Sequence, residues 1–490
     1  MIVMKFGGSS LASAASIARV ASIVRSQAHR HPVIVASALG DTTDALLEIL
    51  SAARRGHAYS AWKQQEAVKT QHFAISEDLL HGREHSDTDY FLRETFRDLH
   101  IRMLELCEGE RVFTPELQDW TLSLGEQLSS RLLAAVLQEH CGETTHFDAR
   151  KLIVTDGAFT QAQPRYWETY ARLRWSLPLA ARDKLVVLGG FIGSTEDGRT
   201  TTLGRGGSDL TASIVGAAVN AEEIQVWKDV DGMLSCDPRL FGAGCQVRRL
   251  SYEEASELAK AGAAILHPEM MIPAQRLRIP IVIRNTFCPE REGTRIDSGA
   301  APGANLIKSV AVKQDVTLLE VRSAGRIDGL ESFLAFCREH SSAATVLGSS
   351  ERAVYLALDE NAKIPDEHLA MNGCLEARVQ GGQAVLTLVG QDLDKELMER
   401  KLTTALTGLS AFLIPGHASL CSVAIAVPQR QVQQSLALVH QAFFFRPDPQ
   451  FFVVGNTSQA QQNTIMSAPS LKRENRPRSF AFSTGLLHTN

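Results

Sequence analysis

Short runs dominated by apolar residues alternate along this chain with segments of helical periodicity. The runs stand at residues 2–6, 32–38, 184–191, 223–232 and 279–287. Strands that are apolar on both faces must be buried on both sides, which is typical of a parallel sheet covered by helices. Residues 43–140 have a mostly helical composition, and residues 114–140 give the strongest helical pattern. The sequence therefore predicts an α/β domain with a long helical excursion.

Composition limits the class of protein. A chain of 490 residues is too long for one ordinary core, so two or three domains are expected. Because the net charge is only -5, we expect neither nucleic acid nor a membrane as a partner. The N-terminus lacks a basic region followed by a long apolar segment, so no signal peptide or membrane span is expected. The eight cysteines form no C-x-x-C pair, which favours reduced thiols in the cytoplasm over disulfides or a zinc site.

The composition changes after the last apolar run. Proline, glycine and alanine crowd residues 289–304, which is typical of a linker. From residue 308 the order is strand, helix, strand, and a similar order follows from residue 384. This weak duplication predicts two small α/β units in tandem. The polar sequence beyond residue 456 predicts a disordered tail.

The first candidate ligand site is a glycine pair after the first apolar run. Lys5 lies near the end of that run, and Gly7 and Gly8 follow it ahead of a helical pattern. Glycines let the backbone approach a ligand closely, and a helix start offers unpaired N–H groups, so the segment suits a phosphate. The alternative is an ordinary strand–helix turn with a solvent-exposed lysine. The Walker spacing is absent, and no G-x-G-x-x-G follows a strand, which argues against a dinucleotide-binding domain.

A second glycine-rich segment, TTLGRGGSDLTA, stands directly before an apolar helix. The planar fork of Arg205 matches a carboxylate. Ser208 and Asp209 are expected to cap the helix. Glu126, in SLGEQLSS, either meets the cation of the same ligand or is an ordinary surface acid, and the helical pattern alone favours the surface acid.

The segment VWKDVDG places polar groups at the carboxyl end of an apolar strand, where ligands bind in open α/β sheets. Lys228 suits a phosphate, and Asp229 or Asp231 suits a nucleotide or magnesium. The alternative is a polar turn that closes a hairpin, which we favour for Asp231. His267 has no second histidine at metal-ligand spacing and is interpreted as a packed residue at a helix start.

Together these motifs resemble the aspartate kinases of the amino acid kinase superfamily. The resemblance rests on VMKFGGSS, VIVASALGDTTDALL, SLGEQLSS, TTLGRGGSDLTA, QVWKDVDGMLSCDPR, ELAKAGAAILHPEM and IPIVIRNTFCPEREGTRI. These segments occur in the family's order over about the first 300 residues. The two small units that follow are similar to the tandem ACT domains that such kinases carry as amino-acid sensors.

The resemblance implies an α/β protein with a three-layer amino acid kinase fold, a mainly parallel sheet covered by helices, followed by two small ferredoxin-like α+β ACT domains. The implied divisions are a catalytic domain at 1–295, a linker at 296–307, ACT domains at 308–380 and 381–456, and a disordered tail at 457–490. Because sensor units of this type pair by their sheet edges, we expect a homodimer or a higher homo-oligomer.

The implied reaction is MgATP-dependent phosphorylation of the side-chain carboxylate of L-aspartate to 4-phospho-L-aspartate. It is the first step toward lysine, threonine and methionine, with feedback from an amino-acid effector at the ACT domains. The residues implied to bind the nucleotide are Lys5, Gly7, Gly8, Ser9, Lys228, Asp229 and Arg239. Those implied to surround aspartate are Ser37, Thr43, Glu126, Arg205 and Ser208, with Arg205 on the α-carboxylate and Glu126 toward the amino group. Lys5 and Asp209 are the implied catalytic pair, in which Asp209 orients the lysine, and no protein metal ligand is implied.

The chemistry of the acceptor agrees with this assignment. A carboxylate with an ordinary pKa near 4 is already ionised at pH 7, so no general base is needed. The obstacle is repulsion between an anionic nucleophile and an anionic triphosphate. Catalysis must therefore come from positioning and from positive charge.

Three positions depart from the family pattern. Ser9 stands where threonine is common and keeps the hydroxyl. Ala264 stands where many relatives have a lysine that reaches ATP, and we expect Lys228 to compensate. Thr345 stands where lysine-inhibited relatives commonly have an aspartate, so the identity of the effector stays open.

Two alternatives remain. One is another amino acid kinase, acting on glutamate or acetylglutamate. The other is a catalytically silent regulatory subunit that binds amino acids through residues 308–455. The presence of Lys5, Glu126, Arg205 and Asp209 argues against the silent subunit, which would not need all four.

Overall fold

The computed structural model describes residues 1–263, 266–299, 305–323, 344–349, 353–359, 374–415 and 419–453. The chain divides into one unit at Met1–Val453 and a second at Val454–Asn490. The predicted tail, the predicted helix at residues 329–340 and Ala264 lie outside the described residues.

An eight-stranded sheet organises the N-terminal part, in the order β3-β4-β2-β1-β7-β10-β11-β9. The strands are β1 (Ile2–Phe6), β2 (Pro32–Ala36), β3 (Thr144–Phe147), β4 (Leu185–Gly189), β7 (Ile224–Lys228), β9 (Arg249–Ser251), β10 (Ile281–Asn285) and β11 (Thr294–Asp297). Strand β1 lies at the centre and pairs in parallel with β2 and β7, so that Lys5 stands beside Val35 and Val226. Only the β10–β11 pair is antiparallel. The predicted mainly parallel sheet is confirmed.

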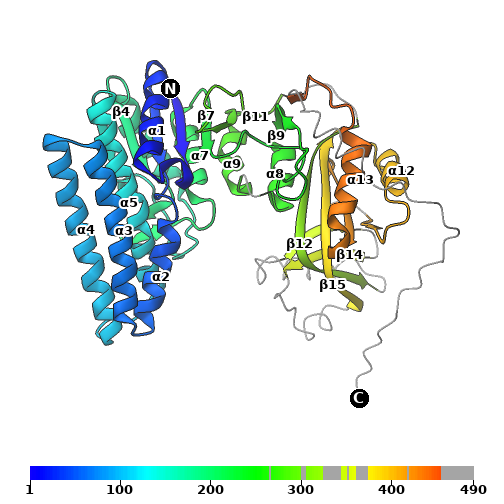
Figure 1. The fold of residues 1–490 in the computed structure, drawn as a ribbon, viewed down its shortest axis with the longest axis horizontal. Coiled ribbons are helices and arrows are strands. Elements are labelled where there is room, and N and C mark those ends of the chain that lie inside the picture. Colours follow the sequence, from blue (N-terminus) through cyan, green and yellow to red (C-terminus); the bar gives the residue numbers. More distant parts are fainter. Residues whose placement is uncertain are drawn as a thin grey trace. The chain divides into compact units, whose positions relative to one another are not determined.

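Helices cover both faces of this sheet. They are α1 (Ala14–Ser26), α2 (Thr42–Arg54), α3 (Ala58–Leu79), α4 (Gly82–Glu108), α5 (Pro115–His140), α6 (Tyr166–Ala180), α7 (Gly207–Val219), α8 (Tyr252–Lys260) and α9 (Met271–Arg276). Helices α2 to α5 form the predicted helical excursion and lie as long neighbouring rods in Figure 1. The helix predicted over residues 114–140 is α5, which Thr114 caps by accepting from the Leu117 N–H.

The side chains of β1 alternate between two separate cores, which gives the three layers. Ile2, Met4 and Phe6 pack with residues of α1 and α5. Val3 packs on the other face with residues of α6 and α7. Because successive strand side chains point to opposite faces, Lys5 belongs to the face of α7.

The C-terminal part contains a six-stranded sheet in the order β13-β14-β12-β15-β17-β16. The strands are β12 (Leu306–Ser323), β13 (Ala344–Ser349), β14 (Ala353–Asp359), β15 (Cys374–Gln391), β16 (Phe412–Leu413) and β17 (Ser422–Pro428). The sequence patterns missed β13. Helices α12 (Lys395–Ala405) and α13 (Val432–Phe444) follow β15 and β17 in the chain. Phe452–Val453 forms a short strand, β18, which pairs with β8 (Gln246–Val247).

The two small units share this one sheet instead of forming separate sheets. Strands β12 and β15 pair antiparallel from Leu306 opposite Gln391 to Ser323 opposite Cys374, with several register shifts. The predicted boundary between residues 380 and 381 falls inside β15, and it stays a prediction. The α+β character expected of ACT domains is confirmed.

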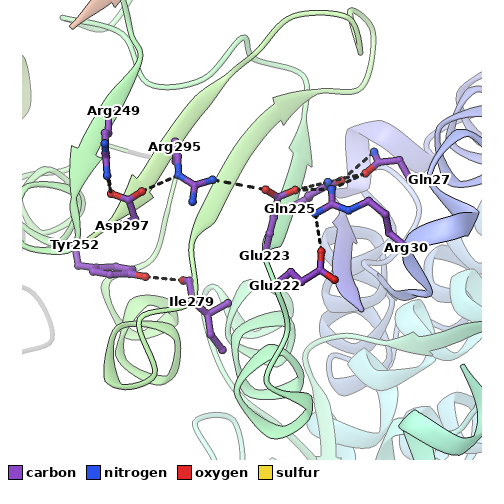
Figure 2. Close-up of polar contacts among 10 residues, drawn as sticks. All are labelled: Gln27, Arg30, Glu222, Glu223, Gln225, Arg249, Tyr252, Ile279, Arg295 and Asp297. Atoms are coloured by element: carbon purple, nitrogen blue, oxygen red, sulfur yellow. Dashed lines mark hydrogen bonds and ion pairs between the residues drawn. The ribbon is translucent and has the colours of Figure 1, made fainter. Parts of the chain in front are cut away.

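Charged side chains and two glutamine amides form a connected network at the edge of the sheet where the parallel strands begin (Figure 2). Its members are Gln27, Arg30, Glu222, Glu223, Gln225, Arg249, Arg295 and Asp297. Asp297 accepts from Arg249 Nε at 2.8 Å and from Arg295 Nε at 2.7 Å. Glu223 lies between Arg295 at 3.8 Å and Arg30 at 3.1 Å. Burial opposes ionisation of Asp297, but the two arginines outweigh it and lower its pKa. The acids at this edge of the sheet are thus paired with arginines. We refer to these eight residues as the amino-end network.

In the part of the chain that the structure describes, every helix is too short or too polar to span a membrane.

Candidate active site

The carboxyl ends of four parallel strands meet at the opposite edge of the sheet. Backbone hydrogen bonds carry the pairing into the loops, from Ser37 N–H to the Phe6 carbonyl, from Gly190 N–H to the Ala36 carbonyl and from Gly7 N–H to the Trp227 carbonyl. Strand β1 is followed by β2 on one side, whereas its other neighbour β7 continues to β10. The winding therefore reverses between β1 and β7, and ligands of open α/β sheets bind at such a reversal.

Two lysines and one aspartate form an ion cluster at this reversal. Lys5 of β1 places its Nζ 2.6 Å from Asp209 Oδ1, and Lys228 of β7 places its Nζ 3.4 Å from Asp209 Oδ2. Asp209 belongs to the first turn of α7 and is buried. Burial opposes its ionisation, but the charges of Lys5 and Lys228 outweigh burial and lower the pKa of the carboxyl. Burial also lowers the pKa of Lys228, and the charge of Lys5 adds to this effect, while Asp209 acts against it.

The first glycine pair lies directly beside this cluster. Gly7 and Gly8 lead into a short 3-10 helix (Gly8–Leu11), and α1 begins only at Ala14, so the predicted direct entry into a helix is corrected. A Cβ at Gly8 would lie 2.7 Å from the Gly40 carbonyl oxygen, which leaves room only for glycine. A Cβ at Gly7 would point toward Lys5 Nζ, 3.8 Å away. The backbone here thus comes close to whatever the lysine binds.

Glu126 is buried, so its interpretation as a surface acid is wrong. The residue as a whole is 3% exposed, and its Oε1 accepts from Ala38 N–H at 3.1 Å and from Ser208 Oγ at 3.4 Å. Oε2 is buried without a hydrogen-bond partner among the described residues. Burial raises the pKa of Glu126 to about 8. Helical periodicity missed this burial because α5 is enclosed on nearly all sides over this stretch.

Helix α7, which follows the second glycine loop, begins with a different capping residue from the one that the sequence predicts. Gly204 and Gly206 have φ values of +72° and +74°, which L side chains rarely adopt. Gly206 is the residue that caps α7, without any side-chain cap. Neither Ser208 nor Asp209 caps the helix, because their side chains are turned toward Glu126 and the two lysines. Arg205 is exposed at the tip of this loop, and the described residues provide no hydrogen bond or ion pair for its side chain.

Asp119 is a positioning residue that the sequence reasoning missed. It is fully buried on α5 and accepts from Thr160 N–H at 2.9 Å, from Thr202 N–H at 2.9 Å and from Thr202 Oγ1 at 2.7 Å. These bonds hold the segment that leads into the loop of Arg205. Burial raises the pKa of Asp119, against the effect of these hydrogen bonds. The sequence feature that could have indicated this role is the position of Asp119, two helical turns before Glu126 on the same helix.

The remaining predicted residues lie around this centre at varying distance. Ser37 and Thr43 are half-buried, after β2 and in the first turn of α2, and Ser9 is exposed in the 3-10 helix. Asp229 is exposed directly after β7. Arg239 is exposed and pairs with Asp237 at 2.7 Å.

Asp231 has a structural role. It accepts from Asn285 Nδ2 at 2.7 Å and is paired with Arg291. It lies in a turn, as favoured, but the turn closes no hairpin, because β7 pairs in parallel with both of its neighbours. His267, which precedes a short 3-10 helix, packs against Gly206, as expected of a packing residue.

Comparison with known proteins gives consistent results. The amino acid kinase family model matches residues 1–285. The chain is 30% identical to the chloroplastic aspartokinase 1 of Arabidopsis thaliana, over 90% of this chain and 80% of that protein. It is 29% identical to the lysine-sensitive aspartokinase 3 of Escherichia coli, over 91% and 99%. The crystal structure of E. coli aspartokinase III with aspartate and ADP superposes with a TM-score of 0.77 at 28% identity, over 91% of this chain and 100% of that one.

Proposed function

This chain belongs to the amino acid kinase family and, within it, to the aspartokinases, and we propose that it transfers the γ-phosphoryl group of MgATP to the side-chain carboxylate of L-aspartate. The observation that carries the proposal is the ion cluster at the reversal between β1 and β7. There, Lys5 and Lys228 come from neighbouring strands and share the single buried carboxylate of Asp209.

The cluster supplies what the reaction demands. Lys5 and Lys228 bring two positively charged ammonium groups to one place. An entering phosphate can bind to them while Asp209 keeps both lysines in position. Because the acceptor is already ionised, Lys5 and Lys228 act by reducing repulsion between the acceptor and the transferred phosphoryl group. Gly7 donates its N–H to the Trp227 carbonyl, so of the two glycines it is Gly8 whose backbone N–H is proposed as a further donor, one that does not titrate.

Aspartate lies, in this proposal, between the loop of Arg205 and the buried face of α5. Arg205 binds the α-carboxylate, because its planar guanidinium matches the two carboxylate oxygens and its exposed side chain is accessible to a ligand. Glu126 receives the α-ammonium group on Oε2, the oxygen that has no hydrogen-bond partner in the described part of the chain. Ser37, Thr43 and Ser208 complete the surroundings as hydroxyl donors or acceptors.

The described residues contain no group of three or more histidine, cysteine, aspartate or glutamate side chains that could enclose a metal ion. Mg²⁺ does not need such a group, because it commonly keeps several waters and binds through substrate phosphates and one or two carboxylates. Asp229, exposed after β7, would hold it on the protein side together with the nucleotide. Bound there, Mg²⁺ would neutralise charge on the phosphates. Arg239 and Ser9 are assigned to the nucleotide as well.

The C-terminal sheet is proposed as the sensor of an amino-acid effector. Thr345 of β13, which stands where lysine-inhibited relatives commonly have an aspartate, accepts from Lys313 Nζ at 3.2 Å, and the same Nζ lies 2.9 Å from Asp359. We propose a homodimer through the sheet edges, which among the described strands are β13 and β16. We also propose the cytoplasm as the compartment, because the six cysteines whose side chains the structure describes are free thiols.

Acyl-phosphate formation, trapped with hydroxylamine, tests the proposal with MgATP and each of aspartate, glutamate and acetylglutamate. We expect turnover with aspartate only, and a KM for aspartate that rises about 100-fold in Arg205→Ala while the KM for ATP stays within twofold. Turnover with glutamate but not aspartate would show that the substrate is glutamate. No turnover with any of the three acids would favour the silent regulatory subunit. Repeating the assay with lysine, threonine and methionine identifies the effector.

A further inference from the structure

A cavity lies beside α5 and is lined by groups that the proposed reaction does not use. Its volume is about 480 Å³, within the range of small-molecule sites. It is enclosed by one face of α4, by α5 just after Glu126, by β3 with the turn that follows it, and by the end of β4 with Ile192. Phe91, Phe147 and Ile192 supply apolar wall, and Gln127, Ser130 and Arg131 supply polar groups from α5.

The acidic and basic groups of this cavity are unequally matched. Asp148 is held by Arg150, with Nη2 at 2.7 Å, and Arg150 lowers the pKa of that carboxyl in spite of burial. The two acids of α4 at the rim, Asp87 and Glu94, pair with the exposed Arg83 and Arg97. Arg131 is half-buried, and the described residues provide no acidic partner for it.

His146 adds a hydrogen-bonding group but no positive charge. Its Nε2 lies 3.0 Å from Ser130 Oγ. Burial, together with the charge of Arg131, lowers the pKa of His146 to about 4. The imidazole is therefore neutral at pH 7. The unbalanced charge in the cavity is the guanidinium of Arg131, beside apolar wall.

We propose that this cavity is a second ligand site, which binds a small organic monocarboxylate with its carboxylate on Arg131 and its apolar body against Phe91, Phe147 and Ile192. A planar guanidinium binds a carboxylate with two parallel hydrogen bonds, and the apolar walls favour an anion with a hydrocarbon part over a bare ion. The site is separate from the aspartate site but adjacent to it. A Cβ at Gly189, which lines the cavity, would lie 3.2 Å from the Cβ of Glu126.

Titration calorimetry of the full chain with 3-phenylpropionate tests the proposal, in the presence of saturating aspartate and ADP. We expect one binding event per chain that aspartate and ADP do not displace, at least tenfold weaker binding in Arg131→Met, and unchanged binding in Arg55→Met. Arg55 is an exposed arginine at the end of α2 and serves as the matched control. Arg131→Lys keeps the charge and the stem, and we expect it to weaken binding several-fold even if Arg131→Met fails to fold.

Several results would overturn the proposal. These are the absence of binding to the wild-type chain, equal binding of the neutral amide 3-phenylpropanamide, equal binding of acetate, or competition by aspartate. The measurement needs no turnover, so it stands apart from the test of the proposed function.

Discussion

The two ends of the N-terminal sheet use charged side chains in opposite ways. At the amino ends of the strands, the amino-end network places Asp297 between Arg249 and Arg295, and Glu223 between Arg295 and Arg30 (Figure 2). At the carboxyl ends, Lys5 and Lys228 share one carboxylate, and Glu126 keeps a buried oxygen for which the described residues provide no partner. Both sets of groups were visible as ordinary charged residues in the sequence.

The difference indicates where a ligand belongs. A charge whose partners are all within the protein contributes to the fold, and it has nothing left to offer a ligand. A buried charge or polar atom that lacks a partner costs free energy in the empty protein, and it is retained where a ligand supplies the partner. The comparison predicts that changes at the carboxyl ends impair turnover and that changes at the amino ends impair stability.

Removing one lysine of the ion cluster should give the largest effect. Lys5→Ala is expected to lower kcat about 10²- to 10³-fold, because one fixed positive group beside the transferred phosphoryl group is lost. Lys184→Ala is the matched control, since Lys184 is a half-exposed lysine that precedes the amino end of β4 and pairs with Glu143. Steady-state kinetics measure both. If the two variants lost activity equally, the two ends of the sheet would not differ as described.

Glu126 should make stability depend on pH in the direction opposite to Asp297, because the pKa of Glu126 is raised and that of Asp297 is lowered. Its pKa is raised from 4.5 to about 8, so between these values the folded chain holds a proton that the unfolded chain has released. Stability from this group is present below pH 4.5 and is lost as pH rises toward 8, by about 1.4 kcal/mol per pH unit. Chemical denaturation between pH 5 and 8 should show this slope in the wild-type chain and a flatter one in Glu126→Gln.

The same carboxyl links protonation to substrate binding. If the ammonium group of aspartate binds to ionised Glu126, binding at pH 7 should release a proton, and calorimetry in buffers of different ionisation enthalpy measures this release. If the wild-type chain released no proton, or if Glu126→Gln released the same amount, the proposed contact between Glu126 and the ammonium group would be contradicted.

Breaking the amino-end network should affect stability alone. Asp297→Asn is expected to lower the free energy of unfolding by about 1–2 kcal/mol, because two arginines lose a charged acceptor that is largely buried. We expect kcat and both KM values to stay within twofold. Asp183→Asn, an exposed aspartate before β4, is the control and should change stability by less than about 0.5 kcal/mol. A fall in kcat in Asp297→Asn with unchanged stability would contradict the division between the two ends.

The smallest effect is expected for Arg30→Met. Its pairs with Glu222 at 3.4 Å and Glu223 at 3.1 Å are partly exposed to water, so solvent screens them. The expected loss is a few tenths of a kcal/mol, smaller still in high salt, without any change in kinetics. Denaturation at low and high salt measures this. A loss as large as that in Asp297→Asn would show that the network acts as one unit.

Much of the architecture could be predicted from the local pattern. The apolar runs at residues 2–6 and 32–38 became β1 and β2, and the helix predicted over residues 114–140 became α5. These predictions succeeded because the periodicity of burial is a property of a few neighbouring residues. The strand β13 was missed, in a segment that the sequence reasoning treated only as a sensor motif.

The amino-acid sequence by itself determined the order of strands and helices, the glycine-rich turns and the presence of Lys5 and Lys228 at strand ends. Only the tertiary structure decided that these lysines share Asp209, that Glu126 is buried with one oxygen unpaired among the described residues, and that the two small units join in one sheet. The physical reason is that a charge acquires its environment from groups far away in the chain. Lys5 and Asp209 are 204 positions apart in the numbering, yet their charged atoms lie 2.6 Å apart.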